Sequence, residues 1–477
     1  MSESGICPTL DFMHPSMQIV LSCKWFKILS ILLQKQVKEA DYGTDVQTIK
    51  AEYERHQKEH KVIDQFQGNV EKCREAEVRF HGEELKIYGE RMTILQKAYN
   101  ELLVTSNKRV SDLHTLHDFI SAAHAELSWL NEKEEAESNR DWADKNLNLK
   151  DVERYYEQLM SELESRESHF SSVQDRGESL IIARHPASPV IEAHMTAMQT
   201  KWAWLLQLTL CLETHLRHAS TSGQFFGECD TAEKWMKERE DQLNSHFAQS
   251  DFKLDEGEAL LKEMQTLRDE LSQYEDEVQR LIETAGEIVP LRARRERLRQ
   301  PIEAVAICKY QNSEISIQKD EVCTVRDNSN KLKWKVTNSR GQQGEAPGVM
   351  FVLTPPDQEA IETAEKLKRH YDRVITLWQK KHLRMRQNMI FATIKVVKSW
   401  DFQQYMSMEK EQRFAIRRAL NEDSEKLIQE GEPNDPQLKR LQREIEEVNR
   451  LFDEWERRAA LEEERRNAAK AFNDRYV

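Results

Sequence analysis

The stretch PIEAVAICKYQNSEISIQKDEVCTVRDNSNKLKWKVTNSRGQQGEAPGVMFVLTPP, Pro301–Pro356, differs from almost everything around it. It is short, rich in β-branched residues and bounded by prolines. The sequence on both sides is charged and nearly free of proline and glycine, which is typical of long helices. The contrast predicts a small β-module inserted into a helical protein.

Composition supports a helical class for the rest of the chain. Only 14 glycines and 11 prolines occur among 477 residues, so there is little material for the turns of an all-β or doubly wound fold. With 32% charged and 39% hydrophobic residues, the chain has enough apolar side chains for narrow helical seams. This balance is typical of coiled coils and helical arrays.

Charge and cysteine usage exclude several kinds of protein. A net charge of −14 argues against binding to nucleic acid backbones, which needs a basic surface. Five arginines within Arg292–Arg299 form a local exception, read as a solvated helix end or linker, or else as a site for an acidic partner or anionic lipid. The seven cysteines include no Cys-x-x-Cys pair, which predicts reduced thiols in a cytosolic protein and gives no zinc pattern.

The N-terminal residues 1–35 receive no domain assignment. Met17–Leu33 is apolar, but Lys24 and Lys27 lie in its middle, where charge opposes a membrane-spanning helix. No small-residue cleavage site follows, as a signal peptide would require. A divergent helix is the expected structure, and any membrane association is expected to be peripheral.

Apolar residues spaced three and four apart mark the helical seams. The clearest seam is followed by a polar segment at Asn139–Asn148, a second helix near Val152–Ile182, and a third helix that Ser188 is expected to cap, with Pro189 at its first position. A further seam follows Leu254. The residues of the two seams are Leu113, Leu116, Ile120, Ala123, Leu127 and Leu130, then Met264, Leu267, Leu271, Tyr274, Val278 and Leu281.

Tryptophans repeat along the chain at a spacing that suggests a tandem array. Trp129 and Trp235 are separated by 235 − 129 = 106 residues, whereas Trp235 and Trp400 are separated by 400 − 235 = 165. The excess, 165 − 106 = 59, is close to the length of the β-module. The repeat resembles the spectrin repeat, a three-helix bundle whose third helix continues into the next unit, as expected here from Leu205 to Trp235. The tryptophans expected in the repeat cores are Trp129, Trp202, Trp235, Trp378 and Trp400.

The β-module resembles an SH3 barrel in the order of its landmarks, but the ligand groove is degenerate. Cys308 replaces the first aromatic ring, and Val349 and Met350 replace the amide and the second ring. An acidic loop is replaced by 311–313, which reads Gln-Asn-Ser. Because a proline-rich peptide needs flat aromatic walls, ordinary ligand binding is not expected, and the protein itself is expected to cover the exposed apolar remnant. The remnant groove consists of Cys308, Tyr310, Trp334, Pro347 and Met350.

A spectrin repeat split by a degenerate SH3 module resembles the plakin domain of plectin, desmoplakin and the spectraplakins. The motifs WLNEKEE at 129–135, DW at 141–142, WAWLLQL at 202–208 and WKV at 334–336 carry the resemblance, which covers roughly residues 45–400. It implies that the module docks on the preceding repeat, about 109–215, and that the chain links the cytoskeleton to adhesion sites. The family's segments that bind actin, microtubules and intermediate filaments have no counterpart within this stretch.

The predicted fold is mainly α: tandem three-helix spectrin-type repeats forming an elongated rod, with a small all-β SH3-like barrel inserted in one repeat. After residues 1–35, the predicted divisions are a partial repeat at 36–108, a repeat at 109–215, the first two helices of a repeat at 216–300, the SH3-like domain at 301–356, the third helix of the split repeat at 357–388, and a C-terminal spectrin-like repeat with a charged helical end at 389–477.

The functional hypothesis is a structural scaffold that connects cytoskeletal filaments to membrane-associated cell junctions in the cytoplasm. Its expected partners are cytoplasmic tails of junctional membrane proteins and cytoskeletal proteins. The alternative is a spectrin-like adaptor whose SH3 domain recruits proline-rich ligands at the membrane skeleton. An enzyme is not expected, and we predict no catalytic residues, no cofactor, no metal, no nucleic acid and no small-molecule substrate.

Three histidine and tryptophan patterns are treated as coincidental. His56 to His60 reads H-x-x-E-H, an arrangement found in some zinc peptidases, but no third ligand motif follows and the segment reads as a solvated helix. His114 and His117 lie one turn apart and are expected at the surface or boundary. Trp202 and Trp204 are two residues apart, so only one can face the helix seam.

Overall fold

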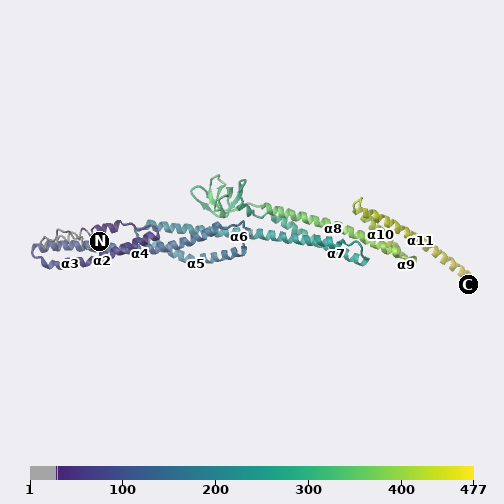
Figure 1. The fold of residues 1–477 in the computed structure, drawn as a ribbon, viewed down its shortest axis with the longest axis horizontal. Helices are drawn as coiled ribbons and strands as arrows, with labels where there is room; N and C mark the ends of the chain where they lie inside the picture. Colours follow the sequence, from purple (N-terminus) through teal and green to yellow (C-terminus); the bar gives the residue numbers. More distant parts are fainter. Residues whose placement is uncertain (1–27, 29–30, 145, 477) are drawn as a thin grey trace. The chain divides into compact units, whose positions relative to one another are not determined.

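The computed structural model describes residues 28, 31–144 and 146–476. The predicted fold class is confirmed: long helices dominate, and a small antiparallel β-region occupies residues 302–353 (Figure 1). The divergent helix expected within residues 1–35 lies mostly outside the described residues, although residues 31–39 are helical. Of the described residues, those up to 216 and those at 295–352 form one compact unit, and those at 217–294 and 353–476 form a second.

In the first unit, a polar residue precedes α2 and a glycine precedes α4. Asp45 caps α2 by accepting hydrogen bonds from the backbone of Gln47 and Thr48 at 2.9 and 3.0 Å. Gly82, at φ 62°, precedes α4, a position that favours glycine. The elements in order are α2 (Val46–Gln65), α3 (Gln67–Glu75), η1 (Ala76–Arg79), α4 (Glu83–Asn139), α5 (Leu149–Ile182) and α6 (Ser188–Ser245).

Two of these helices cross predicted boundaries between repeats. α4 runs through positions 108 and 109, where the sequence suggested a division, and α6 runs through positions 215 and 216. The continuity expected from Leu205 to Trp235 is therefore confirmed. The expected capping by Ser188 is wrong, because Ser188 already lies within α6 and its hydroxyl donates to the carbonyl of His185.

The core of the first unit contains the seam expected on α4. All its predicted members are buried except Leu127, which is half-buried. The seam packs with α5, with α6 and with Ile49 of α2, so one hydrophobic cluster joins four helices. The cluster consists of Ile49, Leu116, Phe119, Ile120, Ala123, Val173, Ala187, Ile191, Met195 and Met198.

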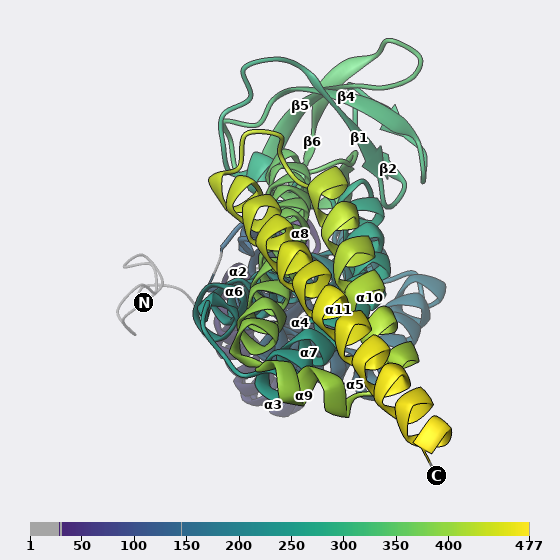
Figure 2. The ribbon, with the colours of Figure 1, turned by 90° about the vertical axis from the view of Figure 1, so that its right-hand side faces the viewer.

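The β-module is a five-stranded antiparallel sheet in the order β6-β5-β4-β1-β7, with β2 and β3 as a separate pair (Figure 2). Alternate residues of β5 point inward, so Trp334 and Val336 are buried while Lys333 and Lys335 are exposed. A register shift between Val325 and Asp327 bends β4. The strands are β1 (Ile302–Ala306), β2 (Tyr310–Gln311), β3 (Ser316–Ile317), β4 (Val322–Asp327), β5 (Lys333–Thr337), β6 (Gln343–Pro347) and β7 (Phe351–Leu353), with the turn η4 (Gly348–Met350) before β7.

The second unit contains two hydrophobic clusters that share α8. The first joins the α6 residues beyond 216 to α7 and α8 and contains most of the seam predicted after Leu254. The second joins the end of α8 to α9, α10 and α11. The elements are η2 (His246–Ala248), α7 (Leu254–Ala285), η3 (Arg292–Arg294), α8 (Gln358–Ser399), α9 (Phe402–Ser407), α10 (Lys410–Glu430) and α11 (Pro436–Tyr476).

The two ends of the β-insertion meet within the second unit. The backbone amide of Asp357 donates to the carbonyl of Ile288, 2.7 Å away. Asp357 then caps α8 through the Glu359 amide. The helix expected near Asp357 is therefore present, and it continues past 388 to Ser399 without a break at the predicted division.

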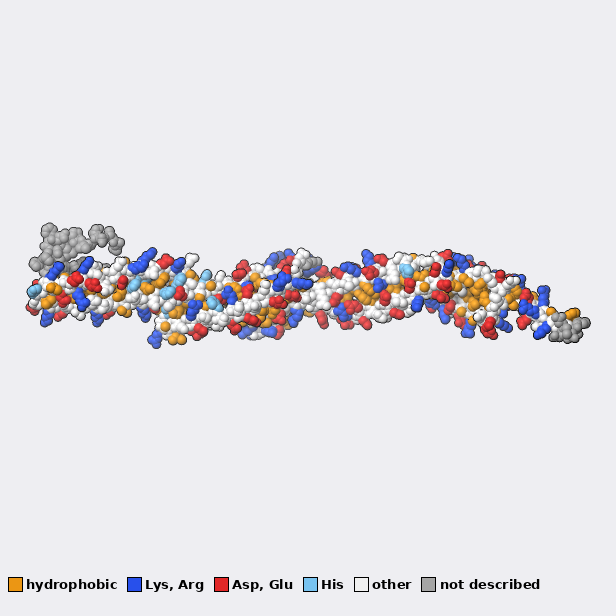
Figure 3. All heavy atoms as spheres, turned by 90° about the horizontal axis from the view of Figure 1, so that it is seen from below, with side chains coloured by type: hydrophobic (Ala, Val, Ile, Leu, Met, Phe, Trp, Pro, Cys, Tyr) orange, Lys and Arg blue, Asp and Glu red, His pale blue; other side chains and the backbone are white. Residues whose placement is uncertain are grey.

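The surface carries both signs of charge. On the face shown in Figure 3, acidic and basic side chains are interspersed. Among the described residues, no helix combines the length and the apolarity needed to span a bilayer.

Candidate interaction surface of the SH3 module

The remnant groove of the SH3 module is largely closed. Cys308 and Met350 are fully buried, and Trp334 is 2% exposed. Tyr310 and Pro347 are half-buried. A polyproline ligand needs exposed aromatic faces, and Trp334 does not offer one.

Gly348 explains why the ring of Trp334 lies so deep. A Cβ at position 348 would lie 2.6 Å from Trp334 Nε1 and 2.7 Å from its Cε2, closer than side chains pack. The missing side chain lets η4 approach the indole, which also stacks on Phe351 with centroids 6.0 Å apart. The turn that carries Gly348 therefore covers the tryptophan.

One face of α6 meets the closed groove. Trp204, Cys211 and His215, spaced seven and four residues apart, each contact the SH3 module. The Trp204 and Tyr310 ring centroids are 5.8 Å apart, and the sulfur atoms of Cys211 and Cys308 are 3.9 Å apart. His215 Nε2 donates to the Val349 carbonyl over 2.7 Å. We call Trp204, Leu208, Cys211 and His215 the α6 stripe.

The segment between α4 and α5 adds further contacts to the same surface. The Trp142 ring is buried, with its centroid 5.3 Å from that of His215. Arg295, in the basic run before β1, lies 3.7 Å from the carboxylate of Asp141. Part of the basic run therefore pairs with acidic side chains of this chain, and Arg292 likewise pairs with Glu359.

The loop that replaces the acidic ligand loop has a structural role. The Asn312 side-chain oxygen accepts from the amides of Glu314 and Ile315 at 2.9 and 2.8 Å. Its amide nitrogen donates to the carbonyl of Glu345 over 2.9 Å. Asn312 thus holds its own loop, where an acidic residue would hold a ligand arginine.

The five repeat tryptophans are not equivalent. Trp378 is buried, and its Nε1 donates to the carbonyl of Met264 over 2.9 Å. The other four, Trp129, Trp202, Trp235 and Trp400, are half-buried. Trp235 stacks on Tyr274 with centroids 3.9 Å apart, and Trp202 stacks on Phe170 at 4.6 Å. Trp400 ends α8 instead of lying within a helix.

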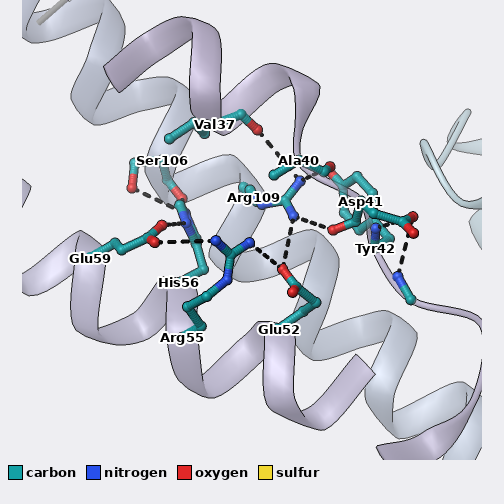
Figure 4. Close-up of polar contacts among 11 residues, drawn as sticks. Val37, Ala40, Asp41, Tyr42, Glu52, Arg55, His56, Glu59, Ser106 and Arg109 are labelled. Carbon is teal, nitrogen blue, oxygen red and sulfur yellow. Dashed lines mark hydrogen bonds and ion pairs between the residues drawn. The ribbon is translucent and has the colours of Figure 1, made fainter. Parts of the chain in front are cut away.

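The H-x-x-E-H segment is not a solvated helix face, so that interpretation is wrong. His56 is 1% exposed, and its Nε2 donates to the Ser106 carbonyl on α4 over 3.2 Å (Figure 4). His60 Nδ1 lies 3.0 Å from the Ser106 hydroxyl. Burial lowers the pKa of His56, with a smaller contribution from the positive charge of Arg109. These histidines join α2 to α4.

Arg109 lies beside this pair and holds the segment that precedes α2. It is 3% exposed, and its guanidinium donates to the carbonyls of Ala40 and Asp41 at 2.8 and 2.5 Å (Figure 4). It also lies 4.4 Å from the centre of the Tyr42 ring and 3.8 Å from the carboxylate of Glu52. The cluster is a structural clamp between helices. In the part of the chain that the structure describes, no group of three or more His, Cys, Asp or Glu side chains could hold a metal ion.

His114 and His117 lie at the surface or boundary, as the sequence predicted. His114 is 58% exposed and His117 is 28% exposed, and both stack on Tyr53. Trp202 faces Phe170 and Trp204 faces the SH3 module, so the two neighbouring tryptophans serve different surfaces.

Sequence reasoning did not find the α6 stripe. The signal was present, because 202–212 reads WAWLLQLTLCL and is apolar around the whole helix, which indicates burial on more than one side. A stripe at steps of four, three and four residues includes Trp204 and His215. The second buried side is the one that faces the SH3 module.

Family models match three parts of the chain. An SH3 domain model matches residues 290–354, a spectrin repeat model matches residues 114–217, and a spectrin-like repeat model matches residues 223–289. Together they cover the β-module, the repeat before it and the two helices that lead into it.

Curated relatives and a solved structure extend the match. The chain is 30% identical over 406 residues to microtubule-actin cross-linking factor 1 of Homo sapiens, covering 84% of this chain and 6% of that protein. It is 27% identical over 381 residues to Desmoplakin-A of Danio rerio, covering 78% of this chain and 18% of that protein. A crystal structure of a rigid four spectrin repeat fragment of the human desmoplakin plakin domain shares the fold, with a TM-score of 0.66 and 23% identity over 91% of this chain and 98% of that one.

The chain therefore spans only a small part of the length of these curated relatives. It contains spectrin repeats and an SH3 domain, it is homologous to microtubule-actin cross-linking factor 1 and desmoplakin, and its resemblance to the plakin family is confirmed.

Proposed function

We propose that this chain is a plakin-type structural scaffold that connects cytoskeletal filaments to membrane-associated cell junctions through protein–protein interactions. Its SH3 module acts as an intramolecular brace, docked on the repeat at 109–215, and does not act as a peptide receptor. The repeats divide as the sequence suggested, into a partial repeat at 36–108, the repeat at 109–215, a split repeat at 216–300 and 357–388, and a C-terminal repeat at 389–477.

The homology supports the linker role. One relative is named a microtubule-actin cross-linking factor and another a desmoplakin, and both align over most of this chain. Long helices with narrow apolar seams suit a scaffold, since each repeat needs to contact only its neighbours. The cytoplasm, at the cytoskeleton and the junctions, is the corresponding location.

The contact of the α6 stripe with the groove carries the brace proposal. The groove positions that would receive a ligand are buried at Cys308 and Met350, and the half-buried Tyr310 faces Trp204. A peptide would have to displace Trp204 and break the hydrogen bond from His215 to Val349. Breaking that hydrogen bond leaves a buried group unpaired, which costs about 1–3 kcal/mol and lowers the affinity for such a peptide.

A peptide titration separates the brace from the alternative adaptor function. The 1–477 chain is titrated with a proline-rich PxxP peptide library, alongside Trp204→Ala and a control, Trp129→Ala, which lies on the same repeat away from Tyr310. The brace predicts no micromolar binding by the wild-type chain or by the control. Micromolar binding by the wild-type chain would support the adaptor with a recruiting SH3 domain and contradict the brace.

A second experiment tests the linker role itself. The immobilised chain is presented with purified cytoplasmic tails of adhesion receptors, and binding is measured by biolayer interferometry. The linker predicts saturable binding of at least one tail, and junctional enrichment of the fluorescently tagged chain in epithelial cells. A uniform cytoplasmic distribution together with no tail binding would contradict it.

A further inference from the structure

Two thiols from different modules meet at the brace. The sulfur of Cys211 on α6 lies 3.9 Å from the sulfur of Cys308, which follows β1, and both side chains are fully buried. The two cysteines are 97 residues apart in the chain. Neither is in a disulfide, and the same holds for Cys73, Cys229 and Cys323.

The environment of this pair differs from that of two other buried thiols. Burial raises the pKa of Cys229 and of Cys323 to about 11. At Cys308 the thiol hydrogen bond with Cys211 outweighs burial and lowers the pKa. Since the thiolate is the reactive form, this pair is the one among the three sites that favours sulfur chemistry.

We propose that Cys211 and Cys308 form a redox-sensitive pair, oxidised by peroxides to a disulfide that locks the SH3 module onto α6. The inference deepens the proposed brace and rests on its docked arrangement. The geometry carries it: a disulfide needs sulfur atoms about 2.05 Å apart, and the two sulfurs already face each other across the contact at 3.9 Å.

The reaction balances with hydrogen peroxide as the oxidant. The Cys308 thiolate attacks one peroxide oxygen, the O–O bond breaks, and Cys308 becomes a sulfenic acid while the released hydroxide takes a proton to give water. The Cys211 thiolate then attacks the sulfenic sulfur, an S–S bond forms, and the S–O bond breaks to release a second water. Two thiols and one peroxide thus give one disulfide and two waters, and a small-molecule thiol reverses the reaction by exchange.

Burial sets the order of the steps. Peroxide reaches Cys308 when the module opens briefly from α6, because both sulfurs are enclosed when it is docked. Redocking then returns the sulfenic acid to Cys211. The bond would close a loop between two cysteines that are 97 positions apart and so oppose further opening.

The test uses the 1–477 chain, treated with hydrogen peroxide, alkylated under denaturing conditions and digested without reductant. Mass spectrometry should find one linked peptide that joins Cys211 to Cys308. Cys211→Ala and Cys308→Ala should each abolish the linked peptide, because either substitution removes one of the two sulfurs. Cys229→Ala, which removes a buried thiol elsewhere on α6, should leave the linkage unchanged.

Hydrogen exchange distinguishes failure of this inference from failure of the brace. Exchange of the β1 amides should slow about tenfold or more after oxidation, and should return to its starting value after reduction. If the β1 amides are protected in the reduced chain but Cys211 and Cys308 remain alkylatable thiols after peroxide, the redox pair is wrong and the brace stands. If β1 and the α6 stripe exchange freely in the reduced chain, the brace itself is wrong, and this inference with it.

Discussion

His215 on α6 and Val349 in the SH3 module are joined by a hydrogen bond of 2.7 Å, in which the ring nitrogen donates to the backbone carbonyl. The bond is buried and joins residues that are 134 positions apart in the chain. It connects the turn that closes the groove to α6.

Replacing His215 by alanine should therefore loosen the module. The Val349 carbonyl would lose a buried donor, a change that costs about 1–3 kcal/mol. Hydrogen exchange should rise in residues 302–353 and stay unchanged in α2. His124→Ala, at an exposed position of α4, is the control. Equal exchange in both variants would show that the hydrogen bond does not hold the module.

Gly348→Ala should destabilise the SH3 module by about 1–3 kcal/mol, because the new methyl group would overlap the indole of Trp334. Gly227→Ala provides a matched control in α6, where a Cβ meets nothing within 4 Å, and it should stabilise the helix by about 0.5–1 kcal/mol. Denaturant unfolding measures the change in stability of both variants. Hydrogen exchange at β5 shows whether the effect of Gly348→Ala lies in the SH3 module. A neutral Gly348→Ala would mean that η4 can move away from the indole.

The repeat tryptophans should differ in their contribution to stability. Trp378→Ala removes a buried ring and its hydrogen bond to Met264, and should cost about 3–5 kcal/mol. Trp129→Ala removes a half-buried ring, which contacts Arg166 and Trp202, and should cost about 1–3 kcal/mol. Urea unfolding of the two variants gives the comparison. A larger loss for Trp129 would show that its repeat depends on the ring more than its burial suggests.

Acid should destabilise the contact between α2 and α4 through His56. Its pKa is lowered in the folded chain, mainly by burial, so the unfolded chain binds a proton first as the pH falls. Stability is therefore unaffected above the ordinary histidine pKa of about 6.5 and decreases as the pH falls below it. Hydrogen-exchange protection factors of residues 46–65 between pH 7.5 and 5.5, which correct for the slower intrinsic exchange at low pH, measure the effect.

His56→Asn should flatten that pH dependence, whereas His114→Asn, at a position that is 58% exposed, should leave it as in the wild-type chain. A wild-type chain whose protection factors do not fall at pH 5.5 would contradict the prediction.

Arg109→Lys should release residues 37–42 from α4. A lysine keeps the charge, but its single ammonium cannot span the carbonyls of Ala40 and Asp41 and also cover the Tyr42 ring. We expect a loss of about 2–4 kcal/mol, since the buried carbonyls lose charged donors. Faster limited proteolysis between 37 and 45 is the measurement, with Arg55→Lys, at a 51% exposed side chain, as the control.

Much of the helical architecture is predictable from the sequence, because spacing alone places the seams. Leu113, Leu116 and Ile120 recur at three and four residues, and all are buried. The helix start near Asp357 follows from a side chain that accepts hydrogen bonds from the first turn. Apolar spacing and helix capping each depend on residues close together in the chain, so the sequence predicts the helices that they form.

The contacts between modules are not predictable in this way. Cys211 and Cys308 are 97 residues apart, and no local pattern relates them. Glu126 occupies a position on the inner face of α4 and is 1% exposed, because Arg166 and His169 of α5 each approach its carboxylate to 2.9 Å. His56 is buried for a similar reason, since its partner lies on another helix. From the sequence alone, such polar residues are expected to face solvent, because their distant partners cannot be recognised.

The hydrogen bond between Asp357 and Ile288 has a consequence for the attachment of the barrel. The chain leaves the repeat and returns to it at almost the same point, so a protein without the intervening residues would need only a short turn to join α7 to α8. The barrel is therefore attached at one point of the repeat, and its removal at this point would leave α7 and α8 close enough to be joined.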